Sequence, residues 1–122
     1  MVNEKIFQTI FDELSKFLQN KWERLVIYLE HGEESYSYLF YVKEEGKYSQ
    51  CFDLGFSEKE ILKSFSKIEK IVSKERDGMN EKWTNMTMVI DDKGNMKTDF
   101  DYTDLSEGNY RYKKEWKKKY LI

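Results

Sequence analysis

The sequence predicts an α+β fold: a single domain with a mostly antiparallel sheet of about five strands, in the order helix, three strands, helix, two strands, helix. Two segments, 3–18 and 56–76, carry apolar side chains at the period of an amphipathic helix. Three others, 22–31, 36–42 and 81–105, alternate with a period of two. Short connections join successive strands, which favours antiparallel neighbours over crossover units.

Length and composition are typical of one small globular domain. With 122 residues the chain can build one hydrophobic core, so we expect a single domain over residues 1–122. Hydrophobic residues make up 39% and aromatic residues 16%, so large rings offset the shortage of aliphatic side chains. The sequence has no long apolar run, no signal-like N-terminus and a single cysteine, Cys51. We therefore expect a cytoplasmic protein without a membrane segment or an internal disulfide.

The first half of the chain is predicted to form one helix and three strands. The helix covers residues 3–18, where Asn3 is a suitable N-cap. The strands are expected over residues 22–31, 36–42 and 48–52. Side chains expected to share one face are Leu25, Ile27 and Leu29 in the first strand and Tyr36, Tyr38, Phe40 and Val42 in the second.

A second helix and a hairpin follow. The helix is predicted over residues 56–76, and the run from Ser57 to Glu60 matches a capping box. Residues 81–105 read as a hairpin, because the Asp, Gly and Asn residues at 91–95 suit a tight turn. Its core face is expected to carry Met86, Met88 and Ile90 on the first strand and Met96, Phe100 and Tyr102 on the second.

The net charge of −2 is unevenly distributed. From Arg111 onward, six basic residues against Glu115 give +5, which leaves −7 for the preceding part of the chain. An acidic body is suited to a basic partner and does not attract phosphate. The Lys-rich end is the predicted last helix, starting at Ser106 or Asn109. Its rings could stack on nucleic-acid bases, but we favour rings packed on the sheet with Lys side chains extending to solvent.

Carboxylates gather at the end of the hairpin. Asp99 and Asp101 alternate with Phe100 and should therefore point away from the core. Three interpretations are open: a solvated sheet face, the carboxylate pair of a metal-dependent hydrolase, or a docking surface for Arg and Lys of a partner. The candidate partner-binding residues are Asp99, Asp101, Tyr102 and Asp104, followed by the acidic pairs Glu33-Glu34 and Glu44-Glu45.

No other pattern points to catalysis. His31 is the only histidine and has no zinc-ligand spacing or orienting partner in the sequence. Cys51 is expected to be a small buried hydrophobe, and the isolated glycines form no phosphate-binding loop. We predict no catalytic residue, no metal ligand and no cofactor.

Several motifs, in order, resemble those of the YezG/EsaG family of bacterial immunity proteins. They are Trp22-Glu23-Arg24 at a strand start, Trp83-Thr84 before a strand, Gly94 in a turn, Phe100-Asp101-Tyr102, and a final helix rich in Trp, Tyr and Lys. The likeness spans most of the chain. It departs from the family in the short region before the central helix and in the many lysines of that helix.

The resemblance implies a function. Members of this family are cytoplasmic antitoxins that bind and block secreted nuclease toxins. It therefore implies an immunity protein that is not an enzyme and acts through a stoichiometric complex with a nuclease toxin domain. We expect no direct nucleic-acid binding, no membrane association, and a monomer or weak homodimer when the protein is free. The alternative is a small nucleic-acid-binding protein acting through the Lys-rich C-terminal helix.

Overall fold

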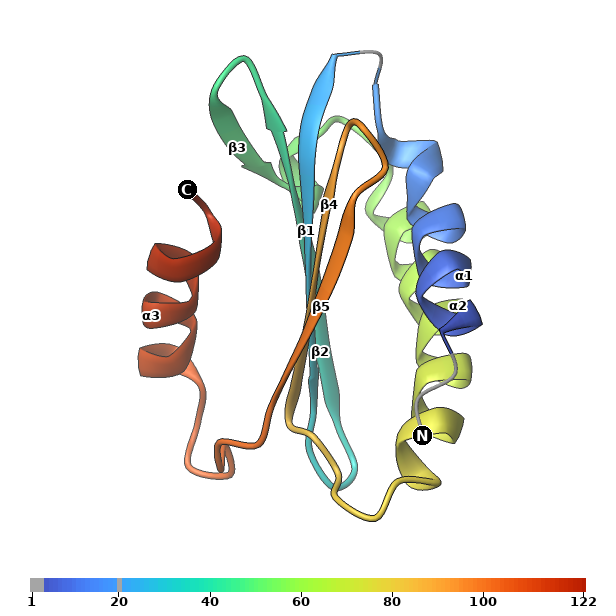
Figure 1. The fold of residues 1–122 in the computed structure, drawn as a ribbon, viewed down its shortest axis with the longest axis vertical. Helices are drawn as coiled ribbons and strands as arrows, with labels where there is room; N and C mark the ends of the chain where they lie inside the picture. Colours follow the sequence, from blue (N-terminus) through green and yellow to red (C-terminus); the bar gives the residue numbers. More distant parts are fainter. Residues whose placement is uncertain (1–3, 20) are drawn as a thin grey trace.

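The computed structural model describes residues 4–19 and 21–122, and in these residues five strands form one antiparallel sheet in the order β3-β2-β1-β4-β5. Helices α1 and α2 cover one face of the sheet and α3 covers the other (Figure 1). The elements are α1 Lys5–Leu14, β1 Trp22–His31, β2 Tyr36–Glu44, β3 Lys47–Gln50, α2 Glu58–Asp77, β4 Asn85–Asp91, β5 Met96–Asp101 and α3 Tyr110–Tyr120, with 3-10 turns at Ser15–Phe17 and Cys51–Asp53. The predicted α+β class and element order are confirmed.

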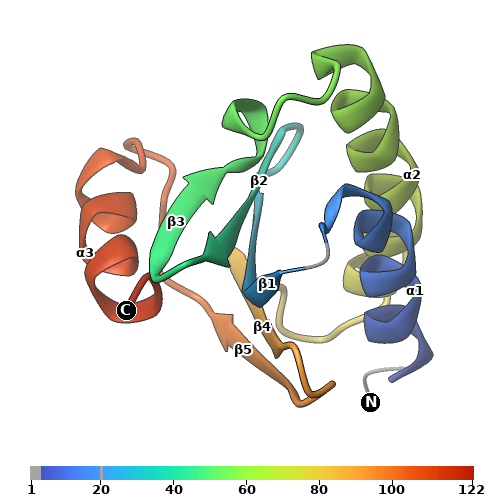
Figure 2. The same cartoon turned by 90° about the horizontal axis from the view of Figure 1, so that it is seen from above.

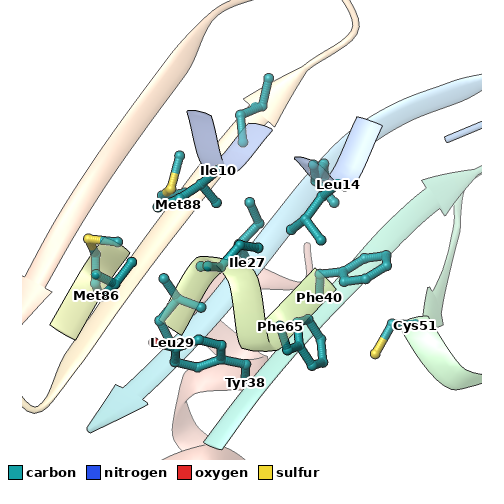
Figure 3. Close-up of a cluster of buried hydrophobic side chains, with 14 of the residues drawn as sticks. Ile10, Leu14, Ile27, Leu29, Tyr38, Phe40, Cys51, Phe65, Met86 and Met88 are labelled. Atoms are coloured by element: carbon teal, nitrogen blue, oxygen red, sulfur yellow. The ribbon is translucent and has the colours of Figure 1, made fainter. Parts of the chain in front are cut away.

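The main core lies between the sheet and the helices α1 and α2. Leu25, Ile27 and Leu29 on β1 have no solvent exposure, as the alternation predicts. Phe40 and Phe65 meet edge to face, with ring centroids 6.0 Å apart (Figure 3). Burying a large apolar side chain contributes about 1.5–3 kcal/mol, so this layer supplies most of the driving force for folding.

A second, smaller core lies between the sheet and α3. Val26 and Tyr28 of β1 are buried on this face, together with Tyr41 and Trp116. Trp116 meets Tyr28 edge to face at 5.0 Å, and its Nε1–H donates to Thr87 Oγ1 at 2.8 Å. The rings of the last helix therefore pack on the sheet, as favoured from the sequence.

Helix ends differ from the prediction. The first helix is α-helical only over Lys5–Leu14, and the predicted N-cap Asn3 lies outside the described residues. Ser57 is the N-cap of α2 but its side chain makes no capping hydrogen bond, so the predicted capping box is wrong. Carboxylates in the first turn, Glu58 and Glu60, instead complement the positive end of the helix dipole.

The outermost strand of the hairpin is less buried than predicted. Met96 is 36% exposed, and Tyr102 is 53% exposed and lies beyond the end of β5, so placing them on the core was wrong. Phe100 is half-buried against the main core. The reason is that β5 is an edge strand, with β4 as its one neighbouring strand among the residues that the structure describes. Among the described residues, no helix is long and apolar enough to cross a membrane.

Candidate functional site

The predicted carboxylates of β5 lie beneath α3. Asp99 Oδ2 accepts a hydrogen bond from the Tyr120 hydroxyl at 2.8 Å, and Asp101 Oδ2 accepts one from the Tyr112 hydroxyl at 2.9 Å. Both side chains point away from the main core, as predicted, but they are half-buried rather than on an open face. They tie the helix to the sheet edge as well as carrying charge.

The electrostatics of these pairs favour one protonation state. Burial alone would raise the pKa of Asp101, but hydrogen bonds from Thr103 and Tyr112 outweigh it and hold that pKa below its usual value. Burial, aided by the hydrogen bond to Asp99, raises the pKa of Tyr120 to about 12. At neutral pH the tyrosines are therefore hydroxyl donors and Asp101 is an anionic acceptor.

A cleft of about 410 Å³ separates β5 from α3. Its walls carry charges of both signs: Lys97, Asp99, Asp101, Glu115 and Lys119. In the part of the chain that the structure describes, no three or more His, Cys, Asp or Glu side chains are placed to hold a metal ion. The geometry therefore gives no support to the hydrolase interpretation, because the aspartate pair is used to hold tyrosine hydroxyls.

The other two predicted residues lie beyond the strand. Tyr102 and Asp104 are both exposed, in the loop that leads to α3. Asp104 Oδ1 accepts the Ser106 backbone N–H at 2.9 Å, and this bond keeps the pKa of Asp104 below its usual value. Asp104 is thus an ionised side chain, held in position by its own loop, at one end of the molecule.

Asp104 lines a groove of about 800 Å³, which is formed by segments that lie at the lower end of the molecule in Figure 1. The β1–β2 turn, the end of α2 and the loop after β5 meet there. Carboxylates outnumber cations in its lining: Glu30, Glu33, Glu34, Asp77 and Asp104 against Arg76 and Lys82. The structure thus joins Asp104 to the acidic pair Glu33-Glu34, whereas Asp99 and Asp101 line the separate cleft under α3. We call this groove the acidic groove.

His31, for which the sequence indicated no role, lies in the lining of the acidic groove. It is 6% exposed, its Nε2 is hydrogen-bonded to the Tyr38 hydroxyl, and its ring meets Trp83 edge to face at 5.2 Å. Burial, together with the nearby Arg76, lowers the pKa of His31 to about 4, so the imidazole is neutral at pH 7. No local signal could reveal this cluster, because His31 comes from β1, Tyr38 from β2 and Trp83 from the segment before β4.

Contacts of Arg76 with Trp83 hold one wall of the acidic groove in place. The Arg76 Nε–H donates to the backbone carbonyl of Trp83 at 2.6 Å, and the guanidinium lies 5.5 Å from the centre of the Trp83 ring. These contacts fasten the end of α2 to the segment that enters β4. The wall is therefore held by packing and hydrogen bonding rather than by a free loop.

Comparisons with known proteins show which family this chain matches. The family model described as "Immunity protein YezG-like" matches residues 3–121. A curated protein of Bacillus subtilis (strain 168), named "Immunity protein YezG", is 23% identical, covering 84% of this chain and 74% of its own length. A protein of the same name from Bacillus spizizenii is 25% identical, covering 82% of this chain and 68% of its own length. The family match spans every helix and strand of the fold.

Proposed function

The chain belongs to the YezG-like family of immunity proteins, and from this premise we propose that it neutralises a secreted polymorphic nuclease toxin by binding it stoichiometrically in the cytoplasm. The family match over residues 3–121 supports an immunity role, and two relatives are named "Immunity protein YezG". The nuclease target is what the resemblance in Trp83-Thr84 and Phe100-Asp101-Tyr102 implies. In this proposal the protein acts by occupancy and performs no chemistry.

The single observation that carries the proposed docking mode is the acidic groove. It holds more carboxylates than cations at one end of the sheet. A nuclease needs a cationic surface to hold the phosphate backbone of its substrate, so such a groove offers it complementary charge. We place Tyr102 and Asp104 at the contact, with Asp99 and Asp101 behind them along β5. Opposite charges steer encounter and raise the association rate.

The alternative, a nucleic-acid-binding protein acting through α3, finds little support in the geometry. Stacking on bases needs exposed rings, but Trp116 is 4% exposed, and the hydroxyls of Tyr112 and Tyr120 are bound to Asp101 and Asp99. Tyr110 is the freely exposed ring of the described helix, at 82%. One ring among lysines is a poor platform for a single strand.

The test first looks for a gene beside this one that encodes a toxin with a nuclease domain, and then titrates that domain with this protein. Nuclease activity on plasmid DNA and on RNA is measured against increasing amounts of this protein, and light scattering on a sizing column gives the mass of the complex. We expect activity to fall linearly and to vanish at a fixed molar ratio equal to that of the complex. Full nuclease activity with a molar excess of folded protein would overturn the proposal, and so would binding of nucleic acid by this protein alone at physiological salt.

A further inference from the structure

Strand β5 is an open edge of the sheet. In the described residues, the sheet order ends with β5 beyond β4, and no further strand pairs with it. The edge is six residues long, against four for the opposite edge strand β3. Figure 2 shows β5 below the gap between α3 on one side and α1 on the other, with its outer side uncovered. An edge of this kind can accept another strand.

The register identifies the backbone groups on the open side. The hairpin is closed by the Asp91 N–H donating to the Asn95 carbonyl at 3.0 Å. Hydrogen-bonded pairs alternate along an antiparallel ladder, so the backbone groups of Lys97 and Asp99 face β4. Those of Met96, Thr98 and Phe100 face outward. Within residues 4–19 and 21–122, no further backbone group bonds to these three.

We propose that two copies of this protein associate through β5, antiparallel about a two-fold axis at Thr98, to form one continuous sheet. The outward N–H and C=O groups of Met96, Thr98 and Phe100 can form hydrogen bonds with those of the second copy when the two-fold axis passes through Lys97, Thr98 or Asp99. An axis at Lys97 or at Asp99 places two like charges opposite each other, which is destabilising. An axis at Thr98 places Lys97 of each copy opposite Asp99 of the other.

The side chains are available for this exchange. Lys97 is 77% exposed at its side chain and Asp99 34%, and their own contact within one copy is a long 4.0 Å. On the other face of the strand the same register places Met96 opposite Phe100 of the second copy. Met96 also borders a shallow hollow next to Phe7 and Gln8 of α1. Pairing would remove the exposed Met96 from water, which adds an apolar contribution.

The same charges argue for a second copy rather than an unrelated strand. Charged side chains on an edge strand normally prevent pairing with other chains. Here the pattern Lys97-Thr98-Asp99 is its own complement, so the two charges are both satisfied in one antiparallel register. Asp104 and Glu33, in the acidic groove, lie outside the paired residues. Asp99 belongs to both proposed surfaces, but self-association is measured without any toxin, so its outcome is independent of the outcome for toxin binding.

The experiment uses sedimentation equilibrium of the purified protein up to millimolar concentration. The variants are Lys97→Asp, Asp99→Lys and Thr98→Pro, with Lys59→Asp on the exposed start of α2 as the matched charge control. Thr98→Pro removes an outward N–H without taking a bond from β4. Circular dichroism and thermal unfolding establish that each variant is folded. Thr98→Pro is needed as a second kind of variant, because Asp99→Lys also removes the acceptor of the Tyr120 hydroxyl.

We expect a concentration-dependent dimer of the unmodified protein and of Lys59→Asp. Lys97→Asp and Thr98→Pro should raise the dimer dissociation constant about tenfold or more, because each change acts twice across the axis. Mixing Lys97→Asp with Asp99→Lys should restore dimers, since the mixed pair again places opposite charges together. A monomer at millimolar concentration would overturn the proposal, as would a dimer that neither Lys97→Asp nor Thr98→Pro weakens.

Discussion

His31 is the buried ionisable side chain whose environment most clearly affects stability. Burial lowers its pKa to about 4, whereas the unfolded chain titrates it near the ordinary value of about 6.5. As the pH falls through 6.5, His31 binds a proton in the unfolded state but stays neutral in the folded state. The neutral His31 therefore stabilises the folded state fully above about pH 6.5. Between pH 6.5 and pH 4 the free energy of unfolding falls by about 3 kcal/mol.

This pH dependence is tested with His31→Gln, which cannot titrate. Urea unfolding is measured at several pH values between 4 and 7 for both proteins. We expect the free energy of unfolding of the variant to be lower at pH 7 but to change less between pH 6.5 and 4. Curves that stay parallel across this window would contradict the assignment of the slope to His31.

Phe65 is the residue of α2 that contacts the most rings of the core. It is 3% exposed and meets Tyr38 and Phe40 edge to face. Phe65→Ala should lower the free energy of unfolding by about 3–5 kcal/mol, the range for buried aromatic truncation. Leu62→Ala, at a position 48% exposed on the same helix, is the control and should cost far less. If the denaturant midpoints of Phe65→Ala and Leu62→Ala move equally, the inward face of α2 is wrongly placed.

Individual core residues could be predicted where local alternation and burial agree. Met86, Met88 and Ile90 were expected on the core face of β4, and all are buried. Tyr102 and Met96 follow the same alternation but remain exposed. Alternation gives the face of a strand, whereas exposure depends on how many neighbours the strand has and on where the helices end, which no local pattern contains.

At the scale of elements, α3 depends on one tryptophan. Trp116 is 4% exposed, contacts Tyr28, Tyr41 and Tyr120, and donates to Thr87. Trp116→Ala should cost about 3–5 kcal/mol and release α3 from the sheet. Hydrogen exchange measures this directly: amides of α3 should lose protection, while those of α2 keep it. Tyr110→Ala, at the exposed start of the same helix, should leave protection unchanged.

The second core shows what the sequence could not reveal about α3. Val26 and Tyr28 alternate with core residues of β1 and share their face with Arg24 and Glu30, so the pattern of the strand alone does not mark this face as buried. The lysine-rich helix carries few aliphatic side chains to signal burial. Its packing depends on three aromatic rings and on tyrosine hydroxyls reaching Asp99 and Asp101 across the chain. Such contacts between distant segments have no local signature.

This packing changes how the predicted docking residues should be tested. Replacing Asp99 and Asp101 by Lys would remove the acceptors of Tyr120 and Tyr112 as well as reverse two charges. A loss of binding in that variant would therefore mix undocking of α3 with a change of surface charge. Exposed side chains at the end of the molecule separate the two effects, because they hold no other element in place.

At the scale of the whole molecule, the chain has an acidic groove at one end and a lysine-rich helix on one face. Asp104 came from sequence reasoning as a docking residue, and Glu33-Glu34 as an alternative. The structure makes them neighbours around one groove, with His31 in its lining. The sequence could indicate that carboxylates were exposed. It could not indicate which of them meet, since the β1–β2 turn and the β5–α3 loop are far apart in the chain.

The most direct test of the account measures association of the toxin nuclease domain with charge-reversed protein. The variant combines Glu33→Lys with Asp104→Lys in the acidic groove. The control combines Asp53→Lys with Asp92→Lys, two exposed positions that do not line the groove, and it changes the net charge equally. Rates are measured by stopped flow at low and at physiological salt, with circular dichroism as the folding control.

The account predicts that the groove variant associates about tenfold more slowly at low salt and loses most of its salt dependence, whereas the control variant keeps nearly the rate of the unmodified protein. The reason is that local charge at the docking surface steers encounter more than net charge does. Equal rates for the two folded variants would contradict the claim that this protein meets its toxin through the acidic groove.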